Sequence, residues 1–332
     1  MRNLLLLMGA FLLLAGPARA FDLKIATVAP DGSSWMQAMR TGGEEIRQRT
    51  DGRVNLKFYA GGVMGNDKSV LRKIRIGQLQ GGAFTAGGLA EVYPDFAIYG
   101  LPLQFRSLAE VDYVRQRLDP VLQQGLEKAG FVSFGLAEGG FALMMADVPV
   151  RSIADMRGRK VWVPEGDQTS YRAMESLGLA PVTLPLTDVM TGLEAGLINV
   201  IPSSAIAAVA FQWYTRIKYV TDTPLVYLYA TLAVDRRAFG RIAPPDQAVV
   251  REVMERIYQE LDRQNRAAED SAKAAMRQQG VTFVTPEPAE VERWRGIAAK
   301  LAGDLRQEGV FSPALFDRFQ QLLADYRRGA GK

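Results

Sequence analysis

The stretch "GRKVWVPEGDQTS", residues 158 to 170, reads as a loop, a short buried strand, a proline stop and a polar cap that leads into a helix. This order is typical of a strand end in an open α/β sheet, where such sheets usually hold their ligands. The centre of the predicted strand is Trp162, although a ligand site at this place would be expected to offer a charged group. The stretch predicts an α/β fold, and it marks Trp162, Pro164 and Glu165 as candidate ligand contacts.

The same order of strands and helices recurs on the N-terminal side of this stretch. Residues 22–30 read as a strand, and "DGSSW" after it signals the start of a helix. Residues 52–60 alternate as a second strand, and residues 81–88 form a short strand and turn. Residues 96–105 read as an apolar, strand-like run. This alternation predicts a mostly parallel α/β sheet.

A second α/β unit follows, which suggests two lobes. Two strand-like runs within residues 131–147 have the length of strands that cross between lobes, and a strand at 225–235 returns to the first lobe. From Pro244 to about Gln279 the pattern is helical, and about 50 Å of helix could reach across both lobes. The predicted division is lobe I at 21–145 and roughly 234–260 and lobe II at 146–233, with C-terminal helices at roughly 261–332 that pack on both.

The first residues have the pattern of a secretory signal peptide. Arg2 gives a positive start, residues 4–16 are apolar, and "ARA" at 18–20 offers a small-residue cleavage pattern. The apolar run is short for a membrane span, so an uncleaved anchor is the lesser alternative. We expect residues 1–20 to be a cleaved signal peptide and the mature, exported protein to begin at Phe21.

Composition excludes several classes of function. The net charge is +4, and loss of Arg2 and Arg19 lowers it to +2, which is too little to indicate nucleic acid as a partner. The chain has no Cys and therefore no disulfide or thiolate chemistry. It also has no His, which removes the usual general base and the commonest transition-metal ligand. We expect no enzyme, no cofactor and no metal site.

Aromatic residues are the more informative candidates. The glycine-rich "GGVMGND" lacks the ending of a phosphate loop, and the pair of carboxylates at Glu165 and Asp167 suits capping or a solvated face. Several aromatic side chains fall near predicted strand ends or helix starts, where either core packing or an apolar binding wall would explain them. These residues are Trp35, Phe84, Phe141, Trp162, Phe211 and Trp213.

The order of motifs resembles the solute-binding subunits of TRAP (tripartite ATP-independent periplasmic) transporters. The resemblance rests on "IATVAPDGSSW", "MGNDKSVLRKIRIG", "YGLPLQF", "ADMRGRKVWVP", "LGLAPVTLPLTDVMTGLEAGLINV" and "KYVTDTPLVY", in this order. It implies the two-lobed periplasmic binding protein fold, with a hinge of crossing strands and a long helix that spans both lobes. It also implies that a ligand bound between the lobes is delivered to membrane permease subunits, without catalysis.

The chain departs from this family where ligands are usually bound. The family usually carries an arginine at the position of Trp162 and often a second one at that of Ala142, and a bidentate arginine pairs with a substrate carboxylate. A family asparagine falls on Ser203, and a family aspartate falls on Asn199. The two arginines and the asparagine, three polar anchors, are therefore missing together. Arg172 and Arg216 are the candidates to replace the missing arginine.

The resemblance and its departures together predict an unusual ligand. An indole cannot neutralise a carboxylate, but it offers an apolar face and a face that binds cations. We expect an apolar, amphipathic or aromatic ligand in place of a simple C4-dicarboxylate. Its walls would be Trp162, Phe141, Trp35 and Trp213, with Ser203, Ser204 and Thr85 as sparse polar contacts. Family members that lack the arginine resemble receptors that work with an additional helical-repeat protein, which implies such a partner in the periplasm here. Two alternatives stay open: a carboxylate receptor with a substitute cation, and a binding or sensory module without a permease.

Overall fold

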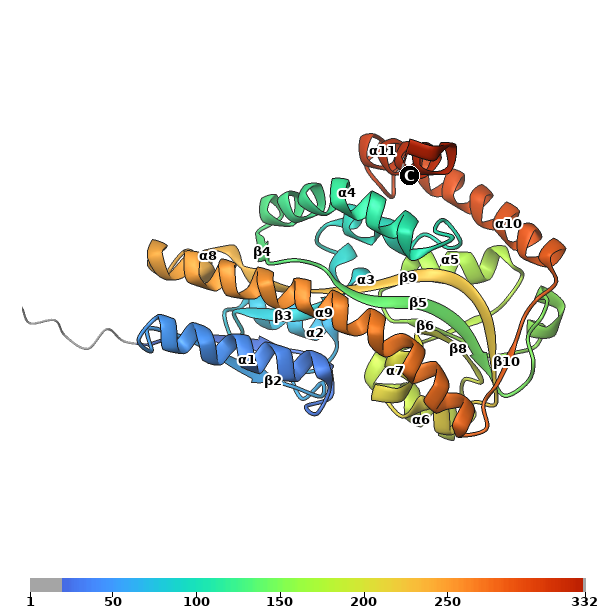
Figure 1. Ribbon diagram of the computed structural model, residues 1–332, viewed down its shortest axis with the longest axis horizontal. Coiled ribbons are helices and arrows are strands. Elements are labelled where there is room, and N and C mark those ends of the chain that lie inside the picture. Colours follow the sequence, from blue (N-terminus) through green and yellow to red (C-terminus); the bar gives the residue numbers. More distant parts are fainter. Residues whose placement is uncertain (1–19, 331–332) are drawn as a thin grey trace, which may run out of the picture.

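One ten-stranded sheet passes through both lobes of the protein (Figure 1). The computed structural model describes residues 20–330, so the predicted signal peptide, apart from Ala20, lies outside the described residues. The strand order is β2-β1-β3-β9-β5-β8-β6-β7, and β4 and β10 also pair with β9. The strands are β1 (Phe21–Ala26), β2 (Val54–Tyr59), β3 (Gly81–Thr85), β4 (Phe131–Ser133), β5 (Ala137–Ala146), β6 (Val161–Pro164), β7 (Pro181–Leu184), β8 (Val200–Ser203), β9 (Tyr219–Asp235) and β10 (Thr282–Val284).

The first lobe is built on three parallel strands. β1 lies between β2 and β3 and is parallel to both. Side chains cap four of its helices: Ser33 accepts the backbone N–H of Met36, Asn66 that of Ser69, Thr85 that of Gly88 and Ser107 that of Glu110. The helical segments of this lobe are α1 (Ser34–Arg49), α2 (Asp67–Arg75), α3 (Ala86–Ala90), η1 (Pro94–Gly100) and α4 (Leu108–Lys128).

The second lobe repeats this arrangement of three parallel strands at the other end of the sheet. β6 lies between β7 and β8 and is parallel to both. Its helices are shorter, and side-chain caps at Asp167 and Ser204 begin two of them. The helical segments are η2 (Ile153–Met156), α5 (Gln168–Ser176), η3 (Leu186–Asp188), α6 (Val189–Glu194), α7 (Ala205–Ala210) and η4 (Trp213–Thr215).

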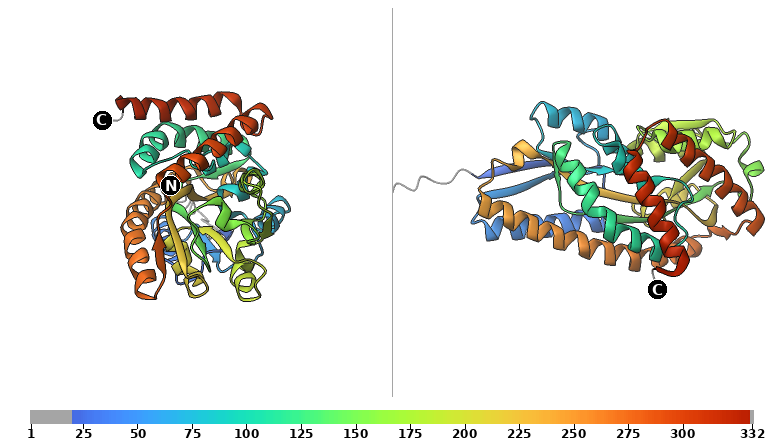
Figure 2. Two further views of the ribbon diagram at one scale, coloured as in Figure 1. Left: turned by 90° about the vertical axis from the view of Figure 1, so that its right-hand side faces the viewer. Right: turned by 90° about the horizontal axis from the view of Figure 1, so that it is seen from above.

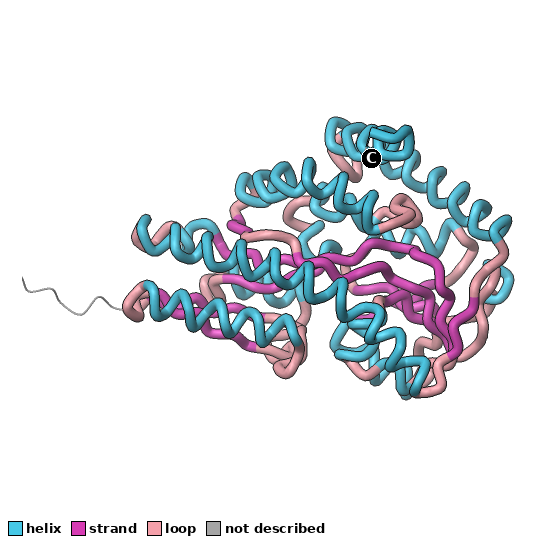
Figure 3. The backbone as a smooth tube through the Cα atoms, in the orientation of Figure 1, coloured by secondary structure: helices cyan, strands magenta, loops and turns pink. Residues whose placement is uncertain are grey.

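Two long antiparallel strands, β5 and β9, connect the lobes (Figure 3). β9 pairs with β3 and β4 near its C-terminal end and with β10 near its N-terminal end. The pairing of β5 with β9 shifts register between Glu138 and Gly140 and again between Ala142 and Met144. Such bulges bend a strand, and here they lie where the strands pass between the lobes. The crossing strands confirm the two-lobed fold that the sequence predicted.

A single helix, α9 (Pro244–Gln278), runs along both lobes and confirms the long helix expected from the sequence (Figure 1). After it, α10 (Pro288–Gln307) packs against α5 of the second lobe, and α11 (Pro313–Asp325) packs against α4 of the first. The two further views show these C-terminal helices lying across the top of the molecule (Figure 2). The remaining helical segments are α8 (Arg236–Phe239) and η5 (Tyr326–Ala330). The exact division into lobes stays a prediction.

One sequence-based expectation is wrong. Residues 96–105 were expected to be strand-like, but Pro94–Gly100 forms the helical turn η1 and the rest is loop. The buried apolar character came from packing: Phe96, Ile98 and Tyr99 fill the core of the first lobe from a turn. Because a short apolar run fits a buried strand or a buried helical segment equally well, its periodicity did not separate them. Between residues 20 and 330, no helix is both long and apolar enough to cross a membrane.

Candidate ligand-binding site

Residues 158–170 form a strand and the start of a helix, as predicted. Val161, Trp162 and Val163 are buried in β6. Gly166 then takes a positive φ of 90°, a turn conformation that glycine adopts without strain. Asp167 accepts the backbone N–H of Ser170 at 2.9 Å and its hydroxyl at 2.6 Å, which caps α5. The strand end therefore presents its residues toward the region between the lobes.

A small apolar cavity of about 110 Å³ lies beside this strand end. Its walls come from the crossing strands β5 and β9, from β6 and β8, from η2, α5 and α10, and from the loop after η1. No Lys or Arg lines it, and Asp167 supplies its only carboxylate among the described residues. The apolar walls include Leu103, Ala142, Met144, Trp162, Met174, Val226, Leu228, Trp294 and Leu301.

Trp162 is both a wall of this cavity and part of the core. Its side chain is 3% exposed, and its ring meets the ring of Trp213 edge-on, with 5.6 Å between the ring centroids. The indole N–H donates to the backbone oxygen of Leu184 at 3.0 Å. Because the N–H already has a partner, Trp162 offers the cavity apolar surface rather than a hydrogen-bond donor. Ala142, the other position where the family often has arginine, lines the same cavity.

A larger cleft of about 760 Å³ adjoins the cavity, and Pro164 and Asp167 line both. One side of the cleft comes from the first lobe and includes Asp67 and Thr85; the other comes from the second lobe and includes Glu165 and Thr187. The two sides touch at the rim. The amide of Asn66 donates to the carboxylate of Glu165, and a Cβ on Gly62 would lie 2.6 Å from Cγ2 of Thr187. The lobes are therefore in a closed arrangement.

The cleft is acidic. Asp67, Glu91, Glu165 and Asp167 line it, and Lys68 is the one cation among its described lining residues. Burial raises the pKa of Asp67 to about 6, against the hydrogen bonds from Thr85, and the charge of Glu165 raises it further. Burial also raises the pKa of Asp167, although Ser170 opposes the shift by hydrogen bonding to the carboxylate. An acidic wall with one lysine repels an anionic ligand.

The structure brings together some of the predicted site residues and separates others from both cavities. Trp162 and Pro164 line the small cavity, and Thr85, Pro164 and Glu165 line the cleft. The other predicted contacts line neither cavity and serve as core or capping residues. These are Trp35, half-buried on α1; Phe84, 1% exposed; Phe141, packed on Tyr227; Ser203, buried; Ser204, the cap of α7; and Trp213, stacked on Phe211.

Neither candidate replacement for the family arginine reaches the site. Arg172 forms an ion pair with Glu308, and Arg216 pairs with Glu194 at 2.8 Å. Both arginines lie outside the lining of the two cavities. Each guanidinium is held by a carboxylate of the protein on a surface, so neither offers a substitute cation to a ligand in this arrangement.

Sequence reasoning missed the contribution of α10 and of the cleft carboxylates. Trp294 and Leu301 reach the cavity from a helix more than 120 residues beyond β6, and a single sequence has no signal for that contact. Asp67 follows the glycine-rich turn "GGVMGN", which was interpreted only as structural. An acidic residue at a predicted helix start, reached by a short turn from a strand end, could have indicated a cleft position.

Comparison with known proteins gives one consistent result. The family model of bacterial extracellular solute-binding proteins, family 7, matches residues 25–307. A solute-binding protein of Roseobacter denitrificans is 24% identical over 89% of this chain and 92% of its own. The 2,3-diketo-L-gulonate-binding periplasmic protein of Escherichia coli is 23% identical over 72% of this chain and 74% of its own.

A solved structure supports the same fold. The TRAP periplasmic solute-binding protein of Haemophilus influenzae, crystallised with L-gulonate, superimposes with a TM-score of 0.84 at 16% identity, over 91% of this chain and 99% of that one. These relatives are receptors and not enzymes. With the family model covering most of the sequence and the two-lobed fold matching, this chain belongs to family 7 of the bacterial extracellular solute-binding proteins, the solute receptors of TRAP transporters.

Proposed function

We propose that this receptor captures an apolar, amphipathic or aromatic ligand between its lobes and delivers it to a TRAP permease. TRAP receptors bind small molecules and work with membrane permease components; the nature of the ligand is the new element. The observation that carries it is the apolar cavity with Trp162 and Ala142 in its wall. Both positions where the family resemblance places an arginine face the same space, and neither bears a charge.

The charge of the site argues against a carboxylate ligand. Two relatives are described with sugar acids, 2,3-diketo-L-gulonate and L-gulonate, which are anions. Burying a carboxylate without a cation costs several kcal/mol. Here the cleft offers Lys68 against four carboxylates, and the cavity offers no cation among the described residues. A carboxylate receptor with a substitute cation would therefore have to depend on Lys68.

The sizes of the two spaces suggest how the ligand divides between them. About 110 Å³ is close to the size of cavity that holds a single benzene-sized group. The adjoining cleft has room for a polar remainder, which hydroxyl groups such as those of Thr85 and Thr187 could contact. Ligand contacts to both lobes would shift the population toward the closed arrangement. The signal peptide, export to the periplasm and a helical-repeat partner stay predictions.

Three matched probes test the polarity of the ligand. 2-Phenylethanol, phenethylamine and 3-phenylpropionate share an aromatic ring on a short chain and differ in the charge at its end. Isothermal titration at pH 7 should show the neutral or cationic probe bound at least about tenfold more tightly than the carboxylate, a difference of about 1.4 kcal/mol. The reverse order would contradict the proposal.

A lysine variant separates the carboxylate alternative from this proposal. If Lys68 serves as a substitute cation, Lys68→Gln should weaken binding of 3-phenylpropionate and leave 2-phenylethanol unaffected. On our proposal, Lys68→Gln leaves binding of 2-phenylethanol unchanged and binds 3-phenylpropionate no more weakly than the wild type does. Extraction of protein purified without refolding adds a second test: an apolar or aromatic molecule in the organic extract supports the proposal, and a small carboxylate identified as the bound species contradicts it.

A further inference from the structure

The long helix α9 changes its mode of packing where it passes from one lobe to the other. Its buried apolar side chains end at Leu261 on the first lobe and resume at Ala272 on the second. Between these two positions no apolar residue of α9 is buried. Polar residues take over the inner face instead, at spacings of three and four that keep them on one side of a helix. They are Asp262, Asn265, Arg266 and Glu269.

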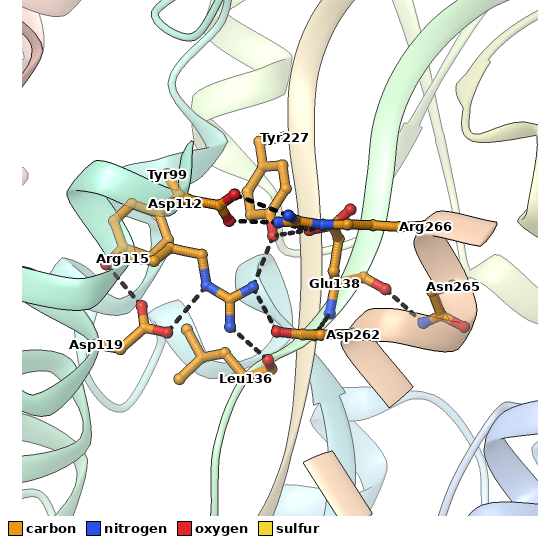
Figure 4. Close-up of polar contacts among 10 residues, drawn as sticks. All are labelled: Tyr99, Asp112, Arg115, Asp119, Leu136, Glu138, Tyr227, Asp262, Asn265 and Arg266. Carbon is orange, nitrogen blue, oxygen red and sulfur yellow. Dashed lines mark hydrogen bonds and ion pairs between the residues drawn. The ribbon is translucent and has the colours of Figure 1, made fainter. Parts of the chain in front are cut away.

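The first part of this polar segment holds the crossing strand β5 at its bulge. Arg266 donates to Oε2 of Glu138 from Nε at 2.9 Å and from Nη2 at 2.7 Å, and its Nη1 reaches Asp112 of α4 at 2.8 Å (Figure 4). The carboxylate of Asp262 accepts a hydrogen bond from the backbone N–H of Glu138 at 2.7 Å. The side-chain amide of Asn265 donates to the backbone oxygen of Glu138 at 2.6 Å. Glu138 is 2% exposed and stands at the register shift of β5.

The last residue of the segment holds the second lobe. The carboxylate of Glu269 accepts the backbone N–H groups of Ala205 and Ile206, which begin α7, each at 3.3 Å. Gly140 lies beside this contact with a φ of +79°, and a Cβ added to it would approach Oε2 of Glu269 to 3.4 Å. Arg266 and Glu269 are thus less than one helical turn apart, yet they bind opposite sides of the hinge.

We propose that Asp262, Arg266 and Glu269 form a hinge clamp that fixes the angle between the lobes in the closed arrangement. Hydrogen bonds are directional and need short distances, whereas apolar surfaces tolerate sliding. A helix keeps Arg266 and Glu269 at a fixed separation, so a rotation of the lobes must break at least one of the two contacts. Arg266 is therefore a positioning residue for ligand capture, although it lines neither cavity. This inference rests on the two-lobed fold and does not depend on which ligand is bound.

Distance measurement between the lobes tests the clamp. The chain has no Cys, so spin labels attach only where cysteines are introduced. Ile76 in the first lobe is 73% exposed and Leu197 in the second is 52% exposed, which makes both suitable for labelling. Double electron–electron resonance on Ile76→Cys/Leu197→Cys gives the populations of short and long distances. Arg266→Gln in this background should lower the weight of the short-distance population at least about threefold, without any ligand added.

A neighbouring arginine supplies the matched control. Arg263 is on the same helix, carries the same charge and, among residues 20–330, pairs only with Glu260 of α9. Arg263→Gln should leave the distance distribution unchanged, and Arg266→Lys should give an intermediate shift because lysine cannot bridge two carboxylates in the same way. Should Arg266→Gln fail to fold, Asp112→Asn removes the ion pair between Arg266 and α4 and should shift the distribution in the same direction. Equal distributions for wild type and the clamp variants, or equal shifts for Arg263→Gln and Arg266→Gln, would overturn the proposal.

Discussion

The hinge and the apolar cavity beside Trp162 differ in how they use charge. At the hinge, two arginines are each held by two carboxylates (Figure 4). Arg115 pairs with Asp119 and Asp262, and Arg266 pairs with Asp112 and Glu138. The cavity beside Trp162 has no Lys or Arg among its described lining residues. Guanidinium–carboxylate pairing, which the family resemblance placed in the cleft, thus occurs in this protein between the lobes' own structural elements. The difference teaches that charge here secures the geometry of the lobes, whereas the wall of the cavity is apolar.

Removal of Arg115 should have the largest effect on stability. Its side chain is 8% exposed and bonds Asp119, Asp262, the hydroxyl of Tyr227 and the backbone oxygen of Leu136. Arg115→Met leaves two partly buried carboxylates without their cation, so the free energy of unfolding should fall by about 3 to 5 kcal/mol. Urea denaturation followed by circular dichroism measures this change.

The neighbouring Arg117 controls for loss of charge on the same helix. Arg117 is exposed and contacts the backbone oxygen and the ring of Tyr113 within α4. Arg117→Met should change the free energy of unfolding by less than about 1 kcal/mol. Similar losses for the two variants would show that the hinge network does not depend on the buried guanidinium and would weaken the contrast with the cavity.

Trp162→Ala should have the next largest effect, and it tests the other side of the comparison. If Trp162 were only a wall of the cavity, Trp162→Ala would weaken binding and leave the fold intact. At 3% exposure and packed on Trp213, the indole is also core, so the free energy of unfolding should fall by about 3 kcal/mol. Trp162→Phe keeps an aromatic wall and should retain most binding of 2-phenylethanol at a smaller loss of stability. Unchanged stability of Trp162→Ala would show that the indole is not part of the core.

Much of the fold could be predicted from the sequence because local patterns carried it. The strand, proline and cap around Trp162 formed as predicted, and α9 ends within one residue of the predicted position. Residues 96–105 failed because a short apolar run has no distinctive period. The strand expected at 225–235 begins earlier, at Tyr219, since Thr221 and Thr223 are buried by pairing and packing that the sequence does not reveal.

The site was less predictable because it depends on which buried aromatic residues face open space. Trp162 and Trp213 are neighbours in one core cluster, but only Trp162 reaches the cavity. Trp35 and Phe84 satisfy the same sequence criterion and pack elsewhere. The family resemblance was enough to identify positions 142 and 162 as site positions that here lack a charge. The walls from α10 and the carboxylates of the cleft come from distant parts of the chain, which the resemblance did not indicate.

The smallest predicted effect concerns a carboxylate that, unlike those of the hinge, has no arginine partner. Burial raises the pKa of Asp67 from 3.8 to about 6. Between these values the folded protein keeps a proton that the unfolded chain has lost, so the free energy of unfolding falls as the pH rises and levels off above about pH 6. A rise of about two in the pKa corresponds to about 3 kcal/mol. Asp67 is only half-buried, so solvent reaches the carboxylate and the loss should be about 1 to 2 kcal/mol. Urea denaturation from pH 4 to pH 7 should show a flatter profile for Asp67→Asn than for wild type.

The pKa of the exposed Glu308 is lowered, chiefly by its hydrogen bond from Arg172, so Glu308→Gln should change the slope in the opposite direction. Parallel profiles for wild type and Asp67→Asn would mean that the cleft stabilises this charge as well as water does, and an anionic wall could then no longer be used against a carboxylate ligand.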